Sequence, residues 1–221
     1  GLTYRELLRN VDAALYRAKA QGKDQYVFFS RDMQEVLLRK IEIQQGIRQA
    51  LLDDALIVHF QPQFSLKDGR IIGYEALVRW NHPERGLLLP GAFIDAAEDA
   101  GLISRLGTRV FELACTFSVM RRDAGLDPIK ISVNVSAKQL QETLFCDMVK
   151  NRVATYGIVP ESIMLEITES ALIGQMDQAK ERIQTLRETG FGVCLDDFGT
   201  GFSSLSYLRE LPFDVLKIDR S

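Results

Sequence analysis

Histidine is scarce in this sequence, and so are the sites that depend on it. The 221-residue chain contains two histidines, His59 and His82. Two histidines argue against a Ser–His hydrolase and against a histidine-rich zinc site. His59 alternates within an apolar run, which predicts a packed or sheet-edge position, and His82 lies in an Asn-His-Pro turn.

Cysteine and long apolar runs are also limited. The three cysteines, Cys115, Cys146 and Cys194, form no CxxC pair, which predicts reduced, buried thiols and a cytoplasmic location. The sequence contains neither a signal peptide nor an apolar run long enough to span a bilayer. We therefore expect no membrane contact from this segment, although a longer protein could carry an anchor elsewhere.

The charge balance is close to neutral. The formal net charge is −3, with 26% charged and 46% hydrophobic residues, which is typical of a globular domain with a core. The chain lacks the excess of positive charge that is typical of proteins that bind nucleic-acid polymers. A small polyanionic ligand would therefore need metal ions or a few well-placed cations.

The first part of the chain differs from the rest. Apolar residues recur at helical spacing from Leu7 to Ala18, Gly22 follows as a stop signal, and Tyr26–Phe29 predicts a short strand. One helix and one strand cannot bury a core, so residues 1–29 are expected to be the tail of a preceding domain. Residues 30–55 are expected to form a connecting helix that Ser30 caps.

A β-hairpin opens the main domain, residues 56–221. Strands over Leu56–Leu66 and Arg70–Trp80 flank a Lys-Asp-Gly turn, which predicts antiparallel neighbours. In the second strand, alternation places Glu75, Leu77 and Arg79 on one face. A carboxylate and a guanidinium on one face suit a metal-assisted phosphate site, and the alternative is a salt-bridged strand edge.

Helices and strands alternate after the hairpin. The expected elements are helices over 90–101 and 103–120, near 141–156, over 176–188 and near 203–211, with strands over 129–135, 163–167, 192–196 and 215–218. Such alternation predicts right-handed parallel crossovers, and polar residues at the strand ends favour a TIM-like (β/α) barrel of the α/β class. Six strands are expected where a closed barrel has eight, so the C-terminal strands are predicted to be missing.

Five ordered motifs identify a resemblance. They are EALVR from Glu75, SVNVS around Asn134, LEITES around Glu166, DDFGTGFSS from Asp196 and LKID around Lys217. Together they resemble the EAL domain, the bacterial phosphodiesterase module for cyclic di-GMP. Residues 11–23 resemble the last helix of a GGDEF domain, the diguanylate cyclase module. The chain is therefore expected to be the EAL part of a tandem GGDEF–EAL protein, with residues 1–29 left from the first domain.

The resemblance implies a set of metal ligands. Glu75, Asn134, Glu166 and Asp196 match the ligands of one ion, and Asp197 matches a ligand of a second. Oxygen-only ligands suit Mg²⁺ or Mn²⁺ rather than zinc. For each carboxylate the alternative is a solvated or turn-forming acid.

The resemblance also implies catalytic and substrate-binding residues. Glu75, Asp197 and Lys217 are expected to be catalytic, with Lys217 positioning the attacking water or balancing charge. The residues expected to bind cyclic di-GMP are Gln61, Leu77, Arg79 and Asp219. Of these, Arg79 suits a phosphate contact because of its planar fork of donors. Glu169 is expected to stabilise the loop after Asp197, a loop that in the family couples metal binding to contacts in a homodimer.

Several functions remain open at this point. The first is hydrolysis of cyclic di-GMP to linear pGpG. The second is a receptor that binds cyclic di-GMP without cutting it, which is favoured because a later glutamate of the family has no counterpart before Ser221. The third is a dimerisation scaffold, and a different barrel metallohydrolase is an alternative outside the family. Metal-dependent turnover separates the first from the second, dimer formation without ligand tests the third, and the Asp-Asp-Phe-Gly and Glu-Ala-Leu motifs argue against the last.

Overall fold

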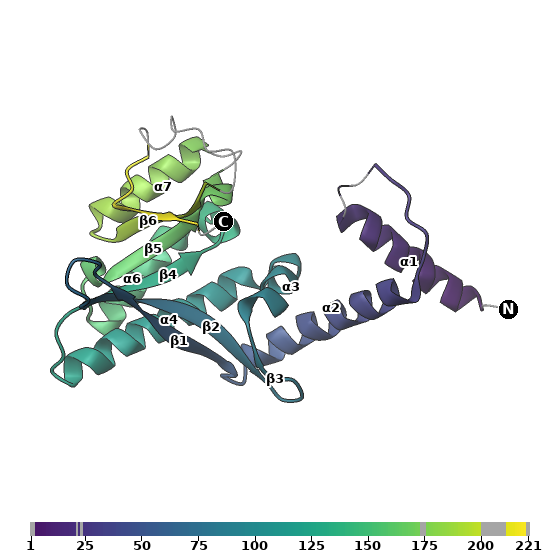
Figure 1. Cartoon of the computed structure of the whole chain (residues 1–221), viewed down its shortest axis with the longest axis horizontal. Coiled ribbons are helices and arrows are strands. Elements are labelled where there is room, and N and C mark those ends of the chain that lie inside the picture. The colour runs from purple at the N-terminus through teal and green to yellow at the C-terminus, as the bar shows by residue number, and fades with distance from the viewer. Residues whose placement is uncertain (1–2, 21, 23, 173–175, 200–210, 220–221) are drawn as a thin grey trace.

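The computed structural model of the chain describes residues 3–20, 22, 24–172, 176–199 and 211–219. Helices α1 (Tyr4–Ala20) and α2 (Arg31–Ala50) form an arm that extends from a body built on a β-sheet (Figure 1). The predicted strand over Tyr26–Phe29 is wrong, since these residues are neither strand nor helix. Tyr26 and Phe28 are 84% and 83% exposed. Their apolar side chains favour a strand, but composition does not show which strand would pair with this segment.

Helix α2 joins the arm to the body. It begins after Ser30 as predicted, but the Ser30 side chain caps no helix amide. Ile43, Ile47 and Ala50 in its C-terminal half are buried in the core of the body. That half of α2 therefore packs as part of the main domain.

The sheet contains seven strands. They are β1 (Leu56–Phe64), β2 (Ile71–His82), β3 (Gly86–Leu88), β4 (Lys130–Val135), β5 (Ile163–Thr168), β6 (Gly192–Phe198) and β7 (Val215–Ile218). Their order is β1-β2-β4-β5-β6-β7, with β3 paired to β2. The predicted hairpin is confirmed because β1 and β2 are antiparallel, and β2 to β7 then pair in parallel along that order. Strand β3, which is three residues long, was not predicted.

Helices follow most of the strands. They are the 3-10 turns η1 (Pro90–Ala92), η2 (Pro160–Ser162) and η3 (Glu169–Leu172) and the helices α3 (Ile94–Asp99), α4 (Ile103–Asp123), α5 (Ala137–Gln141), α6 (Phe145–Tyr156) and α7 (Met176–Glu188). The helix expected near 141–156 is preceded by a separate one, because Ser136 and Gln139 form a capping box that starts α5. The helix expected near 203–211 falls almost entirely outside the described residues.

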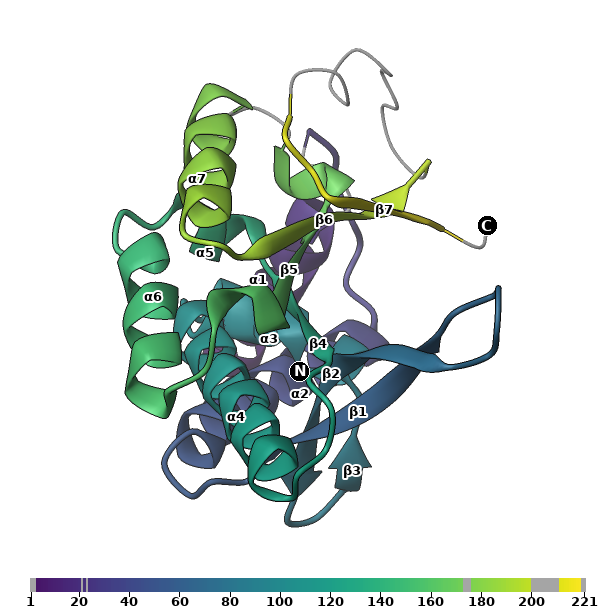
Figure 2. The ribbon, with the colours of Figure 1, turned by 90° about the vertical axis from the view of Figure 1, so that its left-hand side faces the viewer.

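The two faces of the sheet differ in chemistry. Helices α4, α6 and α7 lie along one side of the curved sheet (Figure 2). Alternate residues of the parallel strands, such as Val133, Leu165 and Val193, are buried in the hydrophobic core on that side. The intervening residues, such as Asn134 and Glu166, face the other side. The helices thus cover the apolar face, and the opposite face carries the polar side chains.

The structure supports an α/β fold with a mixed sheet. Within the described residues the strand path runs from β1 to β7 without closing, so the barrel and its missing strands stay predictions. Of the helices in the described residues, none is both long and apolar enough to cross a membrane. The three cysteines are free and buried, as predicted.

The packing of α2 generates a stability prediction. Ile47 is fully buried, whereas Ile41 in the same helix is 42% exposed. Ile47→Ala should lower the free energy of unfolding by about 2–5 kcal/mol because it leaves a cavity in the core. Ile41→Ala, which makes the same change in helix propensity, should cost less than about 1 kcal/mol. Urea denaturation measures both, and equal losses would contradict the packing of α2 described above.

Candidate active site

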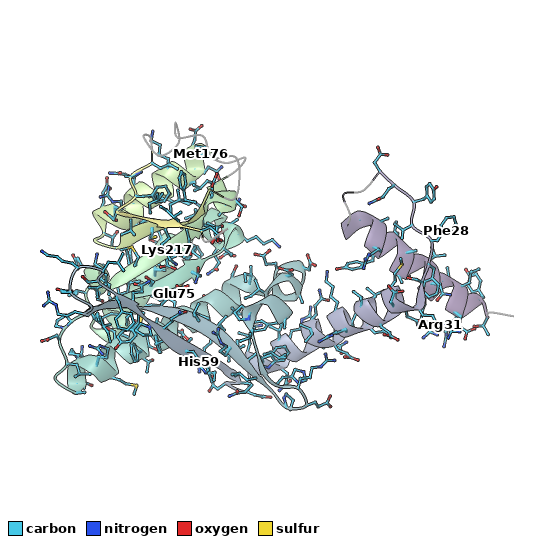
Figure 3. The ribbon with its side chains drawn as sticks, viewed as in Figure 1. Phe28, Arg31, His59, Glu75, Met176 and Lys217 are labelled. Atoms are coloured by element: carbon cyan, nitrogen blue, oxygen red, sulfur yellow. The ribbon has the colours of Figure 1, made fainter. Side chains whose placement is uncertain are left out.

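One ammonium group and three carboxylates meet on the polar face of the sheet. Lys217 on β7 donates hydrogen bonds to Glu166 Oε2 at 2.8 Å, Asp196 Oδ2 at 2.9 Å and Glu75 Oε2 at 3.2 Å. The three acids come from three different strands, β5, β6 and β2. Figure 3 shows Glu75 and Lys217 within the body, far from Phe28 and Arg31 in the arm. The cluster thus contains four of the residues that the sequence motifs singled out.

Strand register explains why these residues meet. Glu75 pairs with Ser132, Asn134 pairs with Glu166, and Glu166 pairs with Cys194 across adjacent strands. Paired residues on neighbouring strands point to the same face, so Glu75 and Ser132 lie in one row, and Asn134, Glu166 and Cys194 lie in the next row on that face. Glu75 lies near the end of the segment of β2 that pairs with β4, although β2 itself continues to His82.

Burial sets the protonation of the cluster. Desolvation raises the pKa of the Glu166 carboxyl, which is only 1% exposed, and the hydrogen bond and charge of Lys217 oppose that rise. Burial alone would lower the pKa of Lys217, but its bonds to Glu166 and Asp196 and the nearby negative charges raise the pKa above its usual value. Lys217 therefore remains an ammonium ion at neutral pH and compensates part of the negative charge.

Asn134 is the neutral member of the cluster. Its amide nitrogen donates to Glu75 Oε1 at 3.0 Å, while its own side chain remains exposed. The amide therefore orients Glu75 from the neighbouring strand. Its carbonyl oxygen is a further hard donor of the kind that Mg²⁺ accepts.

Asp197 adopts an unusual backbone conformation next to the cluster. Its φ is 56°, in the left-handed region, and its backbone N–H donates to Asp196 Oδ1 at 2.9 Å. Desolvation and then the charges of Asp196 and Asp219 raise the pKa of its carboxyl. Asp219 lies close by, and its N–H donates to the Phe198 carbonyl at 3.3 Å. Regular alternation along β6 would place the side chains of Asp196 and Asp197 on opposite faces of the sheet. The left-handed backbone interrupts this alternation, so the two successive aspartates can serve one site.

Three of the four expected substrate contacts lie along β1 and β2, whereas the fourth, Asp219, directly follows β7. Gln61 is exposed and pairs with Glu75 across the hairpin, while Leu77 and Arg79 follow Glu75 at alternate positions and are half-buried. These four residues therefore share the polar face of the sheet. Arg79 donates to the Val78 carbonyl at 2.8 Å. Within the described part of the chain, Arg79 makes no hydrogen bond or ion pair with the Lys217 cluster.

Glu169 reaches the segment after Asp197. Its carboxylate accepts a hydrogen bond from the Gly199 N–H at 3.3 Å. Gly199 has a φ of 105°, a conformation that glycine adopts without strain. The contact places Glu169 at the start of the loop, most of which falls outside the described residues, so its stabilising role stays a prediction.

The oxygen atoms fit a hard divalent cation. One carboxylate oxygen each from Glu75, Glu166 and Asp196 lie within 4.8 Å of one another. Adjacent oxygens around an octahedral ion with bonds of about 2.1 Å are about 3 Å apart, so the three oxygens would move closer together on binding such an ion. With Asn134 and Asp197 adjacent, the donors are oxygens only. The residues present therefore fit Mg²⁺ or Mn²⁺ better than a soft metal.

Sequence reasoning missed Ser132. It is 3% exposed on β4, and it is in register with Glu75 on β2. A serine in an apolar strand, two residues before Asn134, was the available signal, because alternation places both side chains on one face. Cys194 lies on the same face, and burial together with the charge of Glu166 raises the pKa of its thiol to about 12, so it stays protonated.

Comparisons with known proteins identify relatives of the whole chain. MucR of Pseudomonas aeruginosa, named a bifunctional diguanylate cyclase/cyclic di-GMP phosphodiesterase, is 40% identical over 220 residues, covering 100% of this chain and 32% of that protein. NbdA of the same species, named a cyclic di-GMP phosphodiesterase, is 41% identical over 216 residues, covering 98% and 28%. The chain thus spans under a third of the length of these curated relatives.

The structural comparison points the same way. A solved structure of the PaMucR phosphodiesterase in complex with c-di-GMP superposes with a TM-score of 0.78 and 40% identity, covering 81% of this chain and 72% of that one. The family model for the EAL domain matches residues 44–221, a segment that begins inside α2 and includes every residue of the cluster. The chain therefore belongs to the EAL domain family.

Proposed function

We propose that this chain hydrolyses one phosphodiester bond of cyclic di-GMP and releases linear pGpG. Water adds to phosphorus, the bond from phosphorus to a ribose 3′ oxygen breaks, and that oxygen takes up a proton. The observation that carries the proposal is the convergence of Glu75, Glu166, Asp196 and Lys217 on one face of the sheet. Two relatives named for this activity, at 40% and 41% identity, support the choice of substrate.

The negative cluster is suited to metal-assisted phosphate chemistry. We infer that Glu75, Asn134, Glu166 and Asp196 hold one Mg²⁺ or Mn²⁺ and that Asp197 contributes to a second. When bound, the ions would supply positive charge next to the phosphate and lower the pKa of water, so that hydroxide is available to attack phosphorus. Without such charge, three carboxylates and one ammonium would repel a phosphodiester.

Lys217 and Asp197 have complementary parts in the proposed reaction. The pKa of Lys217 is raised, so its ammonium keeps a positive charge and three donors at the site. It can orient the attacking water or stabilise charge on the phosphate oxygens. The pKa of Asp197 is also raised, which makes its carboxylate a better acceptor for a proton from water.

The polar face beyond Glu75 is the proposed substrate surface. Arg79 offers a planar fork of donors for a phosphate, and Gln61 offers an amide for a phosphate or a base edge. We assign the nearby Asp219 to a guanine edge and Leu77 to the wall of the same surface. Glu169 would hold the loop that begins at Gly199.

Residues 1–29 are proposed to be the end of a GGDEF domain that precedes the EAL domain. Leu7, Val11 and Leu15 on α1 are 52%, 53% and 50% exposed, as expected for a face that packs against more protein. MucR, whose name includes a diguanylate cyclase, matches 100% of this chain, whereas the EAL model begins at residue 44. We further propose a homodimer, with the loop after Asp197 at its contact, working in the cytoplasm.

The first prediction concerns the acid that opens the EAL motif. Glu75→Gln should lower kcat/KM by at least about 100-fold, because it removes a charged ligand while keeping the size of the side chain. The linear product can be followed by chromatography. Glu84→Gln is the matched control, since Glu84 is an exposed acid in the turn after β2. Normal hydrolysis by Glu75→Gln would show that the site is assigned wrongly.

The second prediction concerns metal removal. EDTA should abolish formation of pGpG, and excess Mg²⁺ or Mn²⁺ should restore it, because the donor set consists of hard oxygens. Circular dichroism in EDTA controls for unfolding. Binding of cyclic di-GMP without any hydrolysis at saturating metal would instead favour a receptor.

A further inference from the structure

His59 is an exposed histidine on the same face of the sheet as the proposed site. It lies on β1, which is the first strand of the sheet path and therefore an edge strand. Its neighbour Phe60 points the other way and stacks on Phe117 of α4, with the ring centroids 3.7 Å apart. Because successive residues of a strand point to opposite faces, His59 projects from the polar face, away from the helices.

Strand register places His59 beside the proposed substrate surface. His59 pairs with Leu77, and Gln61 pairs with Glu75 in the next row of the hairpin. Rows on one face are about 7 Å apart, because they lie two residues apart along the strand. In the view of Figure 3, Glu75 lies between His59 and Lys217. His59 is therefore one row away from an acid of the cluster and outside the cluster itself.

The side chain of His59 is not engaged by the fold. With the described residues it makes no hydrogen bond, ion pair or aromatic ring contact, and it is exposed. The other histidine differs, because Nδ1 of His82 accepts the backbone N–H groups of Glu84 and Arg85 at 3.2 Å and so holds a turn. The alternative to a substrate contact for His59 is a solvated residue at the sheet edge.

The pairing of His59 with Leu77 favours a base over a phosphate at this row. Directly opposite residues of an antiparallel pair have Cβ atoms about 5 Å apart, so an imidazole ring lies beside an isobutyl group. An anion placed over Leu77 would lose water without gaining a donor from that side chain. A flat purine, in contrast, can lie across both side chains and stack on the ring. For the phosphate, Lys217 and Arg79 supply cations on the same face.

We propose that His59 is a substrate-binding residue whose imidazole ring stacks on one guanine base of cyclic di-GMP. This inference rests on the proposed function and adds a base contact to its substrate surface. With one phosphate at the Lys217 cluster, a nucleoside of the substrate extends over the adjoining row of the hairpin, and its base lies on His59 and Leu77. Stacking uses the face of the ring, so a phenyl ring can replace the imidazole.

The test uses isothermal titration calorimetry with linear pGpG and the full 221-residue chain at saturating Mg²⁺. The linear product carries both bases and is not consumed by the proposed reaction. His59→Ala should weaken binding by about 5–150-fold, the range that loss of one base–aromatic stack produces. His59→Phe, which keeps a flat ring, should stay within about 3-fold of wild type, below that range. Phe64→Ala is the matched control and should also stay within about 3-fold, because it removes a 56% exposed ring farther along β1.

Turnover and stability separate a substrate contact from a structural effect. His59→Ala should raise the KM for cyclic di-GMP and change kcat by less than about 3-fold, because the ring contacts a base and not the reacting phosphate. The melting temperature should stay within about 2 °C of wild type, since the side chain is exposed. A fall in kcat together with a large fall in melting temperature would instead show a structural role and overturn the proposal.

The calorimetric outcomes are equally decisive. Wild-type affinity in His59→Ala, or an equal loss in Phe64→Ala, would overturn the role of His59. An equal loss in His59→Phe would point to a hydrogen bond from an imidazole nitrogen and would overturn the stack. A wild-type chain that binds neither pGpG nor cyclic di-GMP would overturn both this role and the proposed function. A wild-type chain that binds both without hydrolysing cyclic di-GMP would overturn the proposed function alone, and the calorimetric comparison would still decide the role of His59.

Discussion

The interaction on which the site depends is the contact of the Lys217 ammonium with carboxylates from β2, β5 and β6. Three acids within 4.8 Å of one another repel, and one of them is almost completely buried. Burying an unpaired carboxylate is strongly unfavourable, so the arrangement requires a positive charge at its centre. Lys217 supplies that charge from the last described strand. The cluster is therefore assembled from residues up to 142 positions apart in sequence.

The division of the sheet into two faces separates stability from chemistry. Val133, Leu165 and Val193 pack under the helices, while Asn134, Glu166 and Cys194 alternate with them on the other face. Because the helix-side core holds the strands in register, the polar face can concentrate like charges that would disrupt a less stable sheet. Helix α2 adds to the same core, where Gly46 lies so close to the Trp80 ring that a Cβ would come within 2.6 Å.

Much of this site could be predicted from the sequence, because strand alternation and parallel register place residues on faces without knowledge of side-chain contacts. Alternation placed Glu75 on one face of its strand, but the grouping of Glu75 with Glu166, Asp196 and Lys217 rested on the resemblance of the five motifs to the EAL domain. The strand expected over Tyr26–Phe29 failed because apolar composition does not identify a pairing partner. Ser132 was missed for a related reason: a small polar residue in a strand is uninformative until the tertiary structure shows which acid lies beside it.

The left-handed backbone of Asp197 has a consequence for how this position can vary in evolution. Its φ of 56° disfavours most side chains with a Cβ, and asparagine, aspartate and glycine tolerate it best. Asparagine and glycine would keep the turn but lose the negative charge, whereas glutamate would keep the charge at a conformational cost. The left-handed backbone and the proposed need for a negative charge are thus two separate requirements, and aspartate meets both. Drift at this position is constrained by geometry even before catalysis is considered.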